Sequence, residues 1–346
     1  MTSNRLFTFD FLRLLAIVLV VLSHILRMET MDSVRGYLGI IGLGTFFFVS
    51  GYLLLINQKS SGPHGAGTFF KKRFIRIYPL YWLALILTIA VGWLLDSNLF
   101  DWRTIAVYFL GLQSVFVPRY MVEISSYWFI GTILIYYLLY PLLTHGNKIS
   151  SIIFIGVPIF ICLIMIRIFS GLLDGRVFEY FFVFVLGLMA ARSRFFDSDY
   201  FRKWRIPSAV VAVICICIVV IFGPLMPGDL SQISLSLLFT VGLVTLFRIV
   251  LIISTIAAVY WLLSAGSLPS ALKRIIAAGA FASYAVYLFH DVYYSVLGHI
   301  FDIAAPVLSN TAWTLALPIL FVICYYIQLG ADRLLMKQKA MRSELM

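Results

Sequence analysis

The sequence predicts an all-α integral membrane protein with about ten transmembrane helices and one re-entrant or interfacial segment. Of its 346 residues, 62% are hydrophobic and only 12% are charged, about half the charged share of an ordinary soluble domain. Apolar runs near the twenty residues that span a bilayer recur from end to end. No polar stretch is long enough for a soluble domain, so residues 1–346 are predicted to form a single polytopic membrane domain.

The predicted spans follow the apolar runs in chain order, each bounded by charged, glycine or proline residues. They lie near 8–26, 37–56, 78–95, 127–144, 151–170, 177–191, 207–223, 232–264, 276–298 and 312–334. The eighth run is too long for a single perpendicular span, because its 33 residues reach about 50 Å as a helix. We expect it to tilt strongly, to project from the membrane, or to break near Arg248.

The distribution of charge predicts the orientation. The most basic connecting segments carry formal charges of +5, +3, +2 and +2, and they are 57–77, 192–206, 264–275 and 332–346. The positive-inside rule places such segments in the cytoplasm. Five apolar runs separate the first two, and an odd number of spans would put them on opposite sides. We therefore interpret the 14-residue run 104–117 as the re-entrant or interfacial piece, and we expect both termini in the cytoplasm.

The net charge of +11 is thus mainly a topology signal, and it predicts contact with the lipid bilayer rather than with nucleic acid. The first apolar run has no small-residue cleavage site, which favours a retained span over a signal peptide. The four cysteines lie inside apolar runs without metal-ligand spacing. The sequence therefore predicts neither a disulfide framework nor a metal cofactor.

Polar side chains inside the first span form the strongest functional signal. At about 100° per residue, Asp10, Arg13 and His24 fall within roughly 60° of one another on a helix. Arg13 and His24 are about 16 Å apart along the axis, so Arg13 lies near the cytoplasmic end and His24 in the outer half. Ionisable groups inside a bilayer are costly and are typical of functional sites.

A second intramembrane histidine lies in "SYAVYLFHDVYY" of the ninth span. His290 is again some 15 residues from the cytoplasmic start, so the two histidines are predicted to lie at similar depth. A hydrogen bond that links helices is the alternative role of His290. Asp291 is about 100° further round the helix and need not be its partner.

The segment "GTFFKKRFIRIYPLYW" carries a dense basic patch where the chain re-enters the membrane. Arg73 and Arg76, at i and i+3, share a helix face, and Lys72 lies beside them. Two guanidiniums so placed can clamp phosphate oxygens, whereas the alternative is a simple positive-inside anchor. Of the other intramembrane arginines, Arg167 is expected to snorkel outward, and Arg248 has no partner in its own helix.

Five motifs in order resemble those of membrane acyltransferase family 3, also called the transmembrane O-acyltransferase family. They are "FDFLRLLAIVLVVLSH" with its arginine and histidine, "FFFVSGYLL", "RFIRIYPLYW" with its paired arginines and proline, "YWFIGTILIYYLLYPLL", and "SYAVYLFH". One position departs from the family. Where many members carry a glutamate five residues after the tryptophan, this chain has Ile133. Glu179 or Glu123 is the candidate replacement acid.

The resemblance implies transfer of an acyl group, most often acetyl, from cytoplasmic acyl-CoA to a hydroxyl of a cell-surface carbohydrate or glycolipid. It also implies a multi-pass protein of the plasma membrane, and we expect no fused extracytoplasmic domain of the kind that some members carry. Members have also been described as exporters, so an exporter or flippase of a polysaccharide or lipid-linked sugar is the alternative function.

The resemblance also implies a role for each candidate residue. Arg73, Arg76, Lys72 and Arg13 would bind the acyl-CoA, with Arg13 oriented by Asp10. His24 would act as the general base or as a covalent acyl carrier, assisted by His290. The residues predicted to line the acceptor pocket are Tyr284, Trp128, Glu179 and Arg167.

Overall fold

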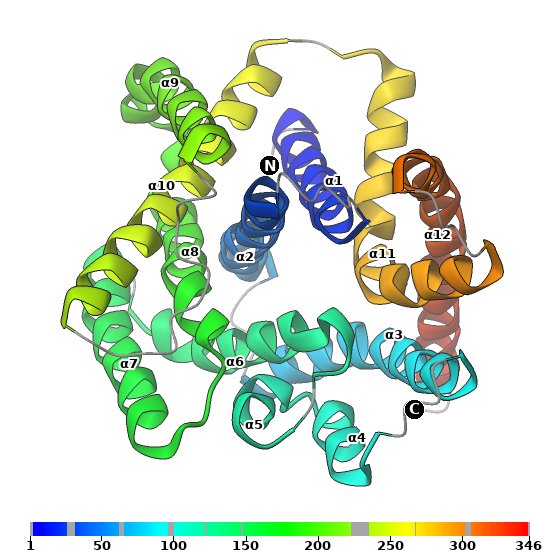
Figure 1. Ribbon diagram of the computed structural model, residues 1–346. Coiled ribbons are helices and arrows are strands. Elements are labelled where there is room, and N and C mark those ends of the chain that lie inside the picture. Colours follow the sequence, from blue (N-terminus) through cyan, green and yellow to red (C-terminus); the bar gives the residue numbers. More distant parts are fainter. Residues whose placement is uncertain are drawn as a thin grey trace.

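The computed structural model describes residues 3–25, 32–61, 66–95, 100–121, 123–146, 148–222, 235–266, 268–301 and 306–344. Within these residues the chain is helical and contains no strand. Figure 1 shows α1 and α2 at the centre, surrounded by the remaining helices. The elements are α1 (Ser3–Ile25), α2 (Asp32–Ser61), α3 (Ala66–Leu95), α4 (Trp102–Phe109), α5 (Gln113–Tyr120), η1 (Ser125–Tyr127), α6 (Trp128–Leu143), α7 (Ile149–Ser170), α8 (Gly175–Arg192), η2 (Phe195–Asp197), α9 (Asp199–Phe222), α10 (Leu235–Ala265), α11 (Ser270–Phe301) and α12 (Pro306–Glu344).

Eight helices of the described chain are long and apolar enough to cross a membrane, so the protein is a multi-pass membrane protein. They are α1, α2, α3, α7, α9, α10, α11 and α12. The two other predicted spans, near 127–144 and 177–191, coincide with α6 and α8. α6 has only 16 residues, and α8 carries three charged side chains in its 18 residues. The count of ten membrane crossings therefore stays a prediction.

The described part of the long predicted run 232–264 forms one helix, and residues 232–234 lie outside the described residues. α10 continues from Leu235 to Ala265 through Arg248, so the alternative of a break at that arginine is wrong.

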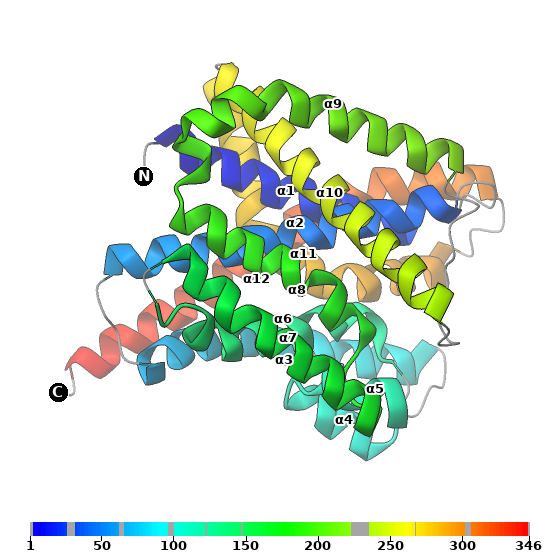
Figure 2. The same ribbon diagram turned by 90° about the vertical axis from the view of Figure 1, so that its left-hand side faces the viewer.

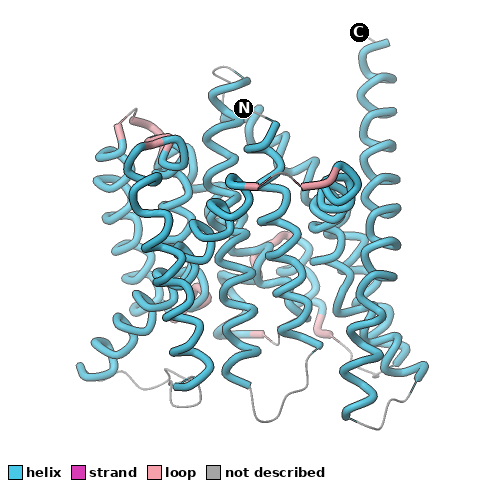
Figure 3. Tube along the Cα trace, turned by 90° about the horizontal axis from the view of Figure 1, so that it is seen from above, coloured by secondary structure: helices cyan, strands magenta, loops and turns pink. Residues whose placement is uncertain are grey.

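The two ends of the described chain lie at the same end of the bundle, where α1 begins and α12 ends (Figures 2 and 3). Which side of the membrane this end faces remains a prediction from charge.

The run 104–117 is divided between two short helices. Its 14 residues are few for a span, and we therefore predicted that it does not cross the membrane. α4 and α5 have eight residues each, about 12 Å, so neither crosses a bilayer. The chain turns between them at Gly111, whose φ of +76° favours glycine. Side chains of α3 hold this turn: the Tyr81 hydroxyl donates to the Tyr108 carbonyl at 2.6 Å, and Trp82 Nε1 donates to the Phe109 carbonyl at 2.9 Å.

The α4–α5 segment supports the start of α6. Gln113 Nε2 donates to the carbonyl of Tyr127 at 2.7 Å, and the Ser114 hydroxyl donates to the carbonyl of Trp128 at 2.7 Å. Both donors are buried. These carbonyls belong to the end of η1 and the start of α6, so the polar residues of the short run position the backbone beside the candidate site.

Small residues let the central helices approach closely. A Cβ added to Gly42 of α2 would lie 2.7 Å from the Ala16 carbonyl oxygen of α1, and one on Gly51 would overlap the backbone of α8. Gly187 of α8 meets the backbone of α2 at Phe48 in the same way. This is the packing of membrane helices in which glycine permits van der Waals contact between backbones.

Candidate active site

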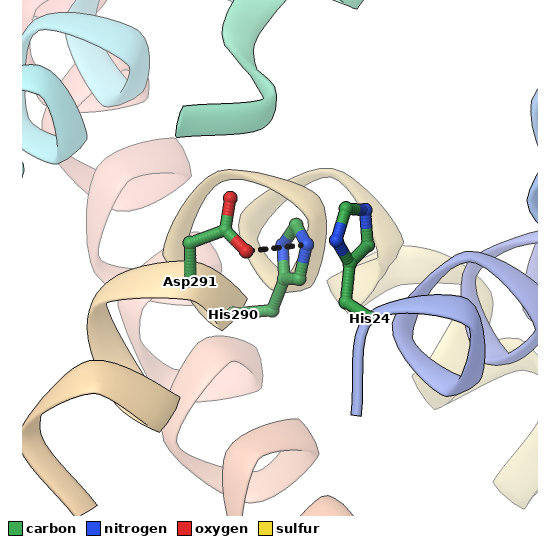
Figure 4. Close-up of side chains that lie close together, drawn as sticks. All are labelled: His24, His290 and Asp291. Carbon is green, nitrogen blue, oxygen red and sulfur yellow. Dashed lines mark ion pairs between the residues drawn. The ribbon is translucent and has the colours of Figure 1, made fainter. Parts of the chain in front are cut away.

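Two histidines from distant parts of the chain meet where α1 packs against α11. His24, in the last turn of α1, and His290 of α11 have ring centroids 5.1 Å apart, with the ring planes at 59°. Figure 4 shows the two rings side by side, with Asp291 next to His290. One ligand-type atom of each of the three residues lies within 4.8 Å of the others. His290 is buried, whereas His24 is exposed.

The hydrogen bond of His290 defines its tautomer. Nδ1 lies 2.7 Å from the Tyr287 carbonyl oxygen, which can only accept, so Nδ1 carries the hydrogen. Nε2 lies 3.2 Å from Asp291 Oδ1, a contact that the angle between consecutive helical residues did not lead us to expect. That approach lacks hydrogen-bond geometry, and Nε2 has no hydrogen-bond partner among the described residues.

Ser126 of η1 completes the cluster. Its hydroxyl lies 3.3 Å from His24 Nε2, and its backbone N–H donates to Asp291 Oδ2 at 3.1 Å. The Tyr287 hydroxyl donates to the Ser126 carbonyl. Sequence reasoning missed Ser126 and Tyr287, because the only signal was their position next to the tryptophan and histidine motifs.

The predicted acyl-CoA residues gather nearer the other end of α1. Arg13 Nη1 is 3.7 Å from Asp10 Oδ1, and both side chains are about one third exposed. Arg73 and Arg76 of α3 lie within electrostatic range of Arg13. The structure therefore brings together three arginines that the sequence placed on two helices.

Aromatic rings support this arginine cluster of Arg13, Arg73 and Arg76. The Arg73 guanidinium lies 5.6 Å from the ring centroid of Phe69 and 5.4 Å from that of Tyr137, within range of cation–π attraction. Arg76 and Lys72 are exposed. Arg73 is thus held by its aromatic neighbours, while Arg76 and Lys72 are exposed.

α1 and α11 each connect the arginine cluster with the histidines. α1 is one uninterrupted helix, so Arg13 and His24 are about 16 Å apart along its axis. On α11, the Tyr284 hydroxyl donates to the Ile77 carbonyl at 2.8 Å, next to Arg76. Tyr284 therefore joins α11 to α3 through its hydroxyl hydrogen and lies nearer the arginines than His290 does.

Trp128, which the sequence predicted to bind the acceptor, packs against an arginine that belongs to an ionic network. The Arg176 guanidinium is 4.3 Å from its ring centroid and also pairs with Asp174 and with Glu123, the latter at 2.9 Å. Tyr180 stacks on the same indole, with centroids 6.0 Å apart. Glu123 is thereby placed in the network around Trp128.

Glu179 and Arg167 make contacts elsewhere. Glu179 Oε1 accepts from Arg248 Nη1 at 2.5 Å, which supplies the partner that Arg248 lacked in its own helix. Arg167 donates to the Leu173 carbonyl, where the chain turns from α7 to α8. Neither of these contacts includes a histidine of the cluster.

Ile133, at the position of the family glutamate, is buried among apolar side chains. The carboxylate next to the two histidines is that of Asp291, which comes from α11 instead of α6. An acid on a different helix therefore occupies the neighbourhood of the candidate base.

Comparison with known proteins identifies the family of the chain. A family model described as Acyltransferase domain matches residues 7–329. No curated protein and no solved structure matches the chain. The matched range includes both histidines and the three arginines of the cluster. Since it covers nearly the whole chain, this multi-pass membrane protein belongs to acyltransferase family 3.

Proposed function

We propose that the protein is an O-acetyltransferase of the plasma membrane, which transfers acetyl from cytoplasmic acetyl-CoA to a hydroxyl of an extracytoplasmic carbohydrate or glycolipid. One observation carries the proposal: α1 joins an arginine cluster near one end to a histidine pair near the other. Coenzyme A has the matching shape, with phosphates at one end and the thioester at the other.

The arginine cluster suits the phosphates of the donor. Guanidinium groups form paired, charge-assisted hydrogen bonds with phosphate oxygens. Exposed Arg76 and Lys72 meet the phosphates first, while Arg13, paired with Asp10, lies deeper and guides the pantetheine arm. The thioester then reaches the level of His24, about 16 Å further along α1.

His24 is suited to the role of general base. Its ring is exposed to an incoming acceptor, and the neutral imidazole has a nitrogen lone pair. It removes the proton of the acceptor hydroxyl as the oxygen attacks the thioester carbonyl. A carbon–oxygen bond forms, the carbon–sulfur bond breaks, and the proton passes to the coenzyme A thiolate. A covalent acyl-histidine is the alternative route, with His24 itself as the first acceptor.

His290 and Trp128 support this reaction from two sides. His290 donates Nδ1–H to the backbone of its own helix, so its ring is held in one orientation beside His24. Trp128 is buried beside Arg176 and Tyr180, so it anchors the start of α6 next to the backbone of Ser126. Tyr284 holds α11 against α3 and so sets the distance between histidines and arginines.

The test is release of free thiol from acetyl-CoA by the purified chain in lipid nanodiscs, with acceptors ranging from simple sugars to lipid-linked oligosaccharides. We expect His24→Ala to lower the rate about 10²- to 10⁴-fold, the usual share of a general base. His299→Ala, at an exposed position of α11, is the matched control and should keep full activity. Full turnover by His24→Ala would refute the assignment. Transport of a labelled glycolipid without thiol release would instead indicate the exporter.

A further inference from the structure

The histidine cluster has the donor set of a transition-metal site. It offers two imidazole nitrogens and one carboxylate oxygen, all within 4.8 Å of one another. In a tetrahedral zinc site such atoms lie roughly 3.3 Å apart, because each is about 2.0–2.2 Å from the metal. His24 is exposed in the last turn of α1, so a side-chain movement of about 1.5 Å closes the set.

His290 is already oriented as a metal ligand. Metal-binding histidines typically donate their second ring nitrogen to a carbonyl or carboxylate, which fixes the tautomer. Nδ1 of His290 makes this bond to the Tyr287 carbonyl, so the lone pair lies on Nε2. The residue is only 1% exposed, and Nε2 has no hydrogen-bond partner within the described chain.

The electrostatics of this nitrogen also favour a cation. The Nε2 lone pair of neutral His290 lies 3.2 Å from Asp291 Oδ1, and a lone pair close to a carboxylate is repulsive. A buried polar atom left without a hydrogen-bond partner is unfavourable. A divalent ion bound to both atoms replaces the repulsion with two coordinate bonds.

His24 and Asp291, the two other candidate ligands, also contact a residue outside the ligand set. Nε2 of His24 is engaged with the Ser126 hydroxyl at 3.3 Å, which leaves Nδ1 for an ion. Asp291 accepts from the Ser126 backbone with Oδ2, and its Oδ1 lies 3.2 Å from His290 Nε2. One residue, Ser126, thereby orients both ligands.

We propose that His24, His290 and Asp291 bind a divalent transition ion of the Zn²⁺ class. Imidazole and carboxylate donors select such ions over Mg²⁺ and Ca²⁺, which prefer oxygen ligands alone. The bound ion occupies a lone pair of His24, so it inhibits acyl transfer. Only this last consequence rests on the proposed function, since binding follows from the ligand geometry.

Binding is tested on the full chain in nanodiscs after treatment with a chelator. Titration with Zn²⁺ by calorimetry should show one ion per chain, and Co²⁺ should give the visible absorption of a tetrahedral complex. His24→Ala and His290→Gln should each weaken binding at least tenfold, whereas His299→Ala should not, and Mg²⁺ should not compete. His24→Ala changes an exposed side chain, so this variant keeps the test valid if His290→Gln misfolds.

Absence of Zn²⁺ binding, or binding that survives both substitutions, would overturn the proposed site. The activity assay is read separately. Reversible inhibition of thiol release by Zn²⁺ supports the site and the base role together. Stoichiometric, histidine-dependent binding that leaves transfer unchanged would support the site and overturn the role of His24 as base.

Discussion

His24 of α1 and His290 of α11 hold their imidazole rings 5.1 Å apart, although they come from opposite ends of the chain. The contact depends on the packing of α1 against α11 and on Ser126, which reaches His24 from a third element. Several properties of this arrangement can be measured.

Tyr287→Phe tests whether acyl transfer requires the backbone of Ser126 to be held in position. The substitution removes the hydroxyl that donates to the Ser126 carbonyl, while the ring stays packed against Phe129. We expect transfer to fall about tenfold to a hundredfold, because small displacements at a reacting centre are costly. Acetyl-CoA affinity, measured by equilibrium binding, should not change. An equal loss of affinity would show that Tyr287 acts on donor binding.

Neutralising the arginine cluster tests the donor site. Arg73→Gln combined with Arg76→Gln should weaken acetyl-CoA binding at least tenfold and reduce its dependence on salt, because charge-assisted hydrogen bonds to phosphate are lost. The double variant Arg202→Gln/Lys203→Gln removes the same charge from another basic segment and serves as control. If both double variants bind acetyl-CoA with equal affinity, Arg73 and Arg76 do not bind the donor and act only as a positive-inside topology signal.

The contact between α2 and α8 predicts a stability effect without a catalytic one. Gly51→Ala should lower the free energy of unfolding by about 1–3 kcal/mol, since the added methyl meets the backbone of Phe184. Gly242→Ala, where a Cβ meets nothing within 4 Å, is the matched control. Thermal unfolding in detergent measures both. A common melting temperature would contradict the close packing.

The ion pair between Arg248 and Glu179 predicts non-additive substitutions. Both side chains are largely buried, at 20% and 29% exposed, so Arg248→Leu should cost about 1.5–3 kcal/mol by leaving the carboxylate without its partner. The double variant Arg248→Leu/Glu179→Leu should regain most of this loss, because it leaves no uncompensated charge. Additive losses in a double-mutant cycle would show that the two residues act independently.

The sequence alone predicted much of the architecture, because the bilayer restricts the choices. A chain that crosses lipid has to satisfy its backbone hydrogen bonds internally, and apolar runs near twenty residues have the length at which a helix does so. This reasoning also placed 104–117 outside the spans, and α4 and α5 are indeed too short to cross. It did not decide whether the run that forms α10 is one long helix or is broken near Arg248, since periodicity does not distinguish the two.

The candidate site was only partly visible in the sequence. The spacing of Arg13 and His24 on one helix needs no tertiary information, and α1 is the continuous helix that the estimate assumed. Contacts between helices are different, because they depend on rotation and tilt, which packing decides. The partner of Arg248, the role of Ser126 and the approach of Asp291 to His290 therefore appeared only in the folded chain.

Local composition thus determined that this protein spans a membrane and which of its polar side chains are costly to bury there. Tertiary structure decided which of those side chains meet. The physical reason is that hydrophobic length and helical period are properties of consecutive residues, whereas a site made by α1, η1 and α11 depends on how small residues let separate helices pack.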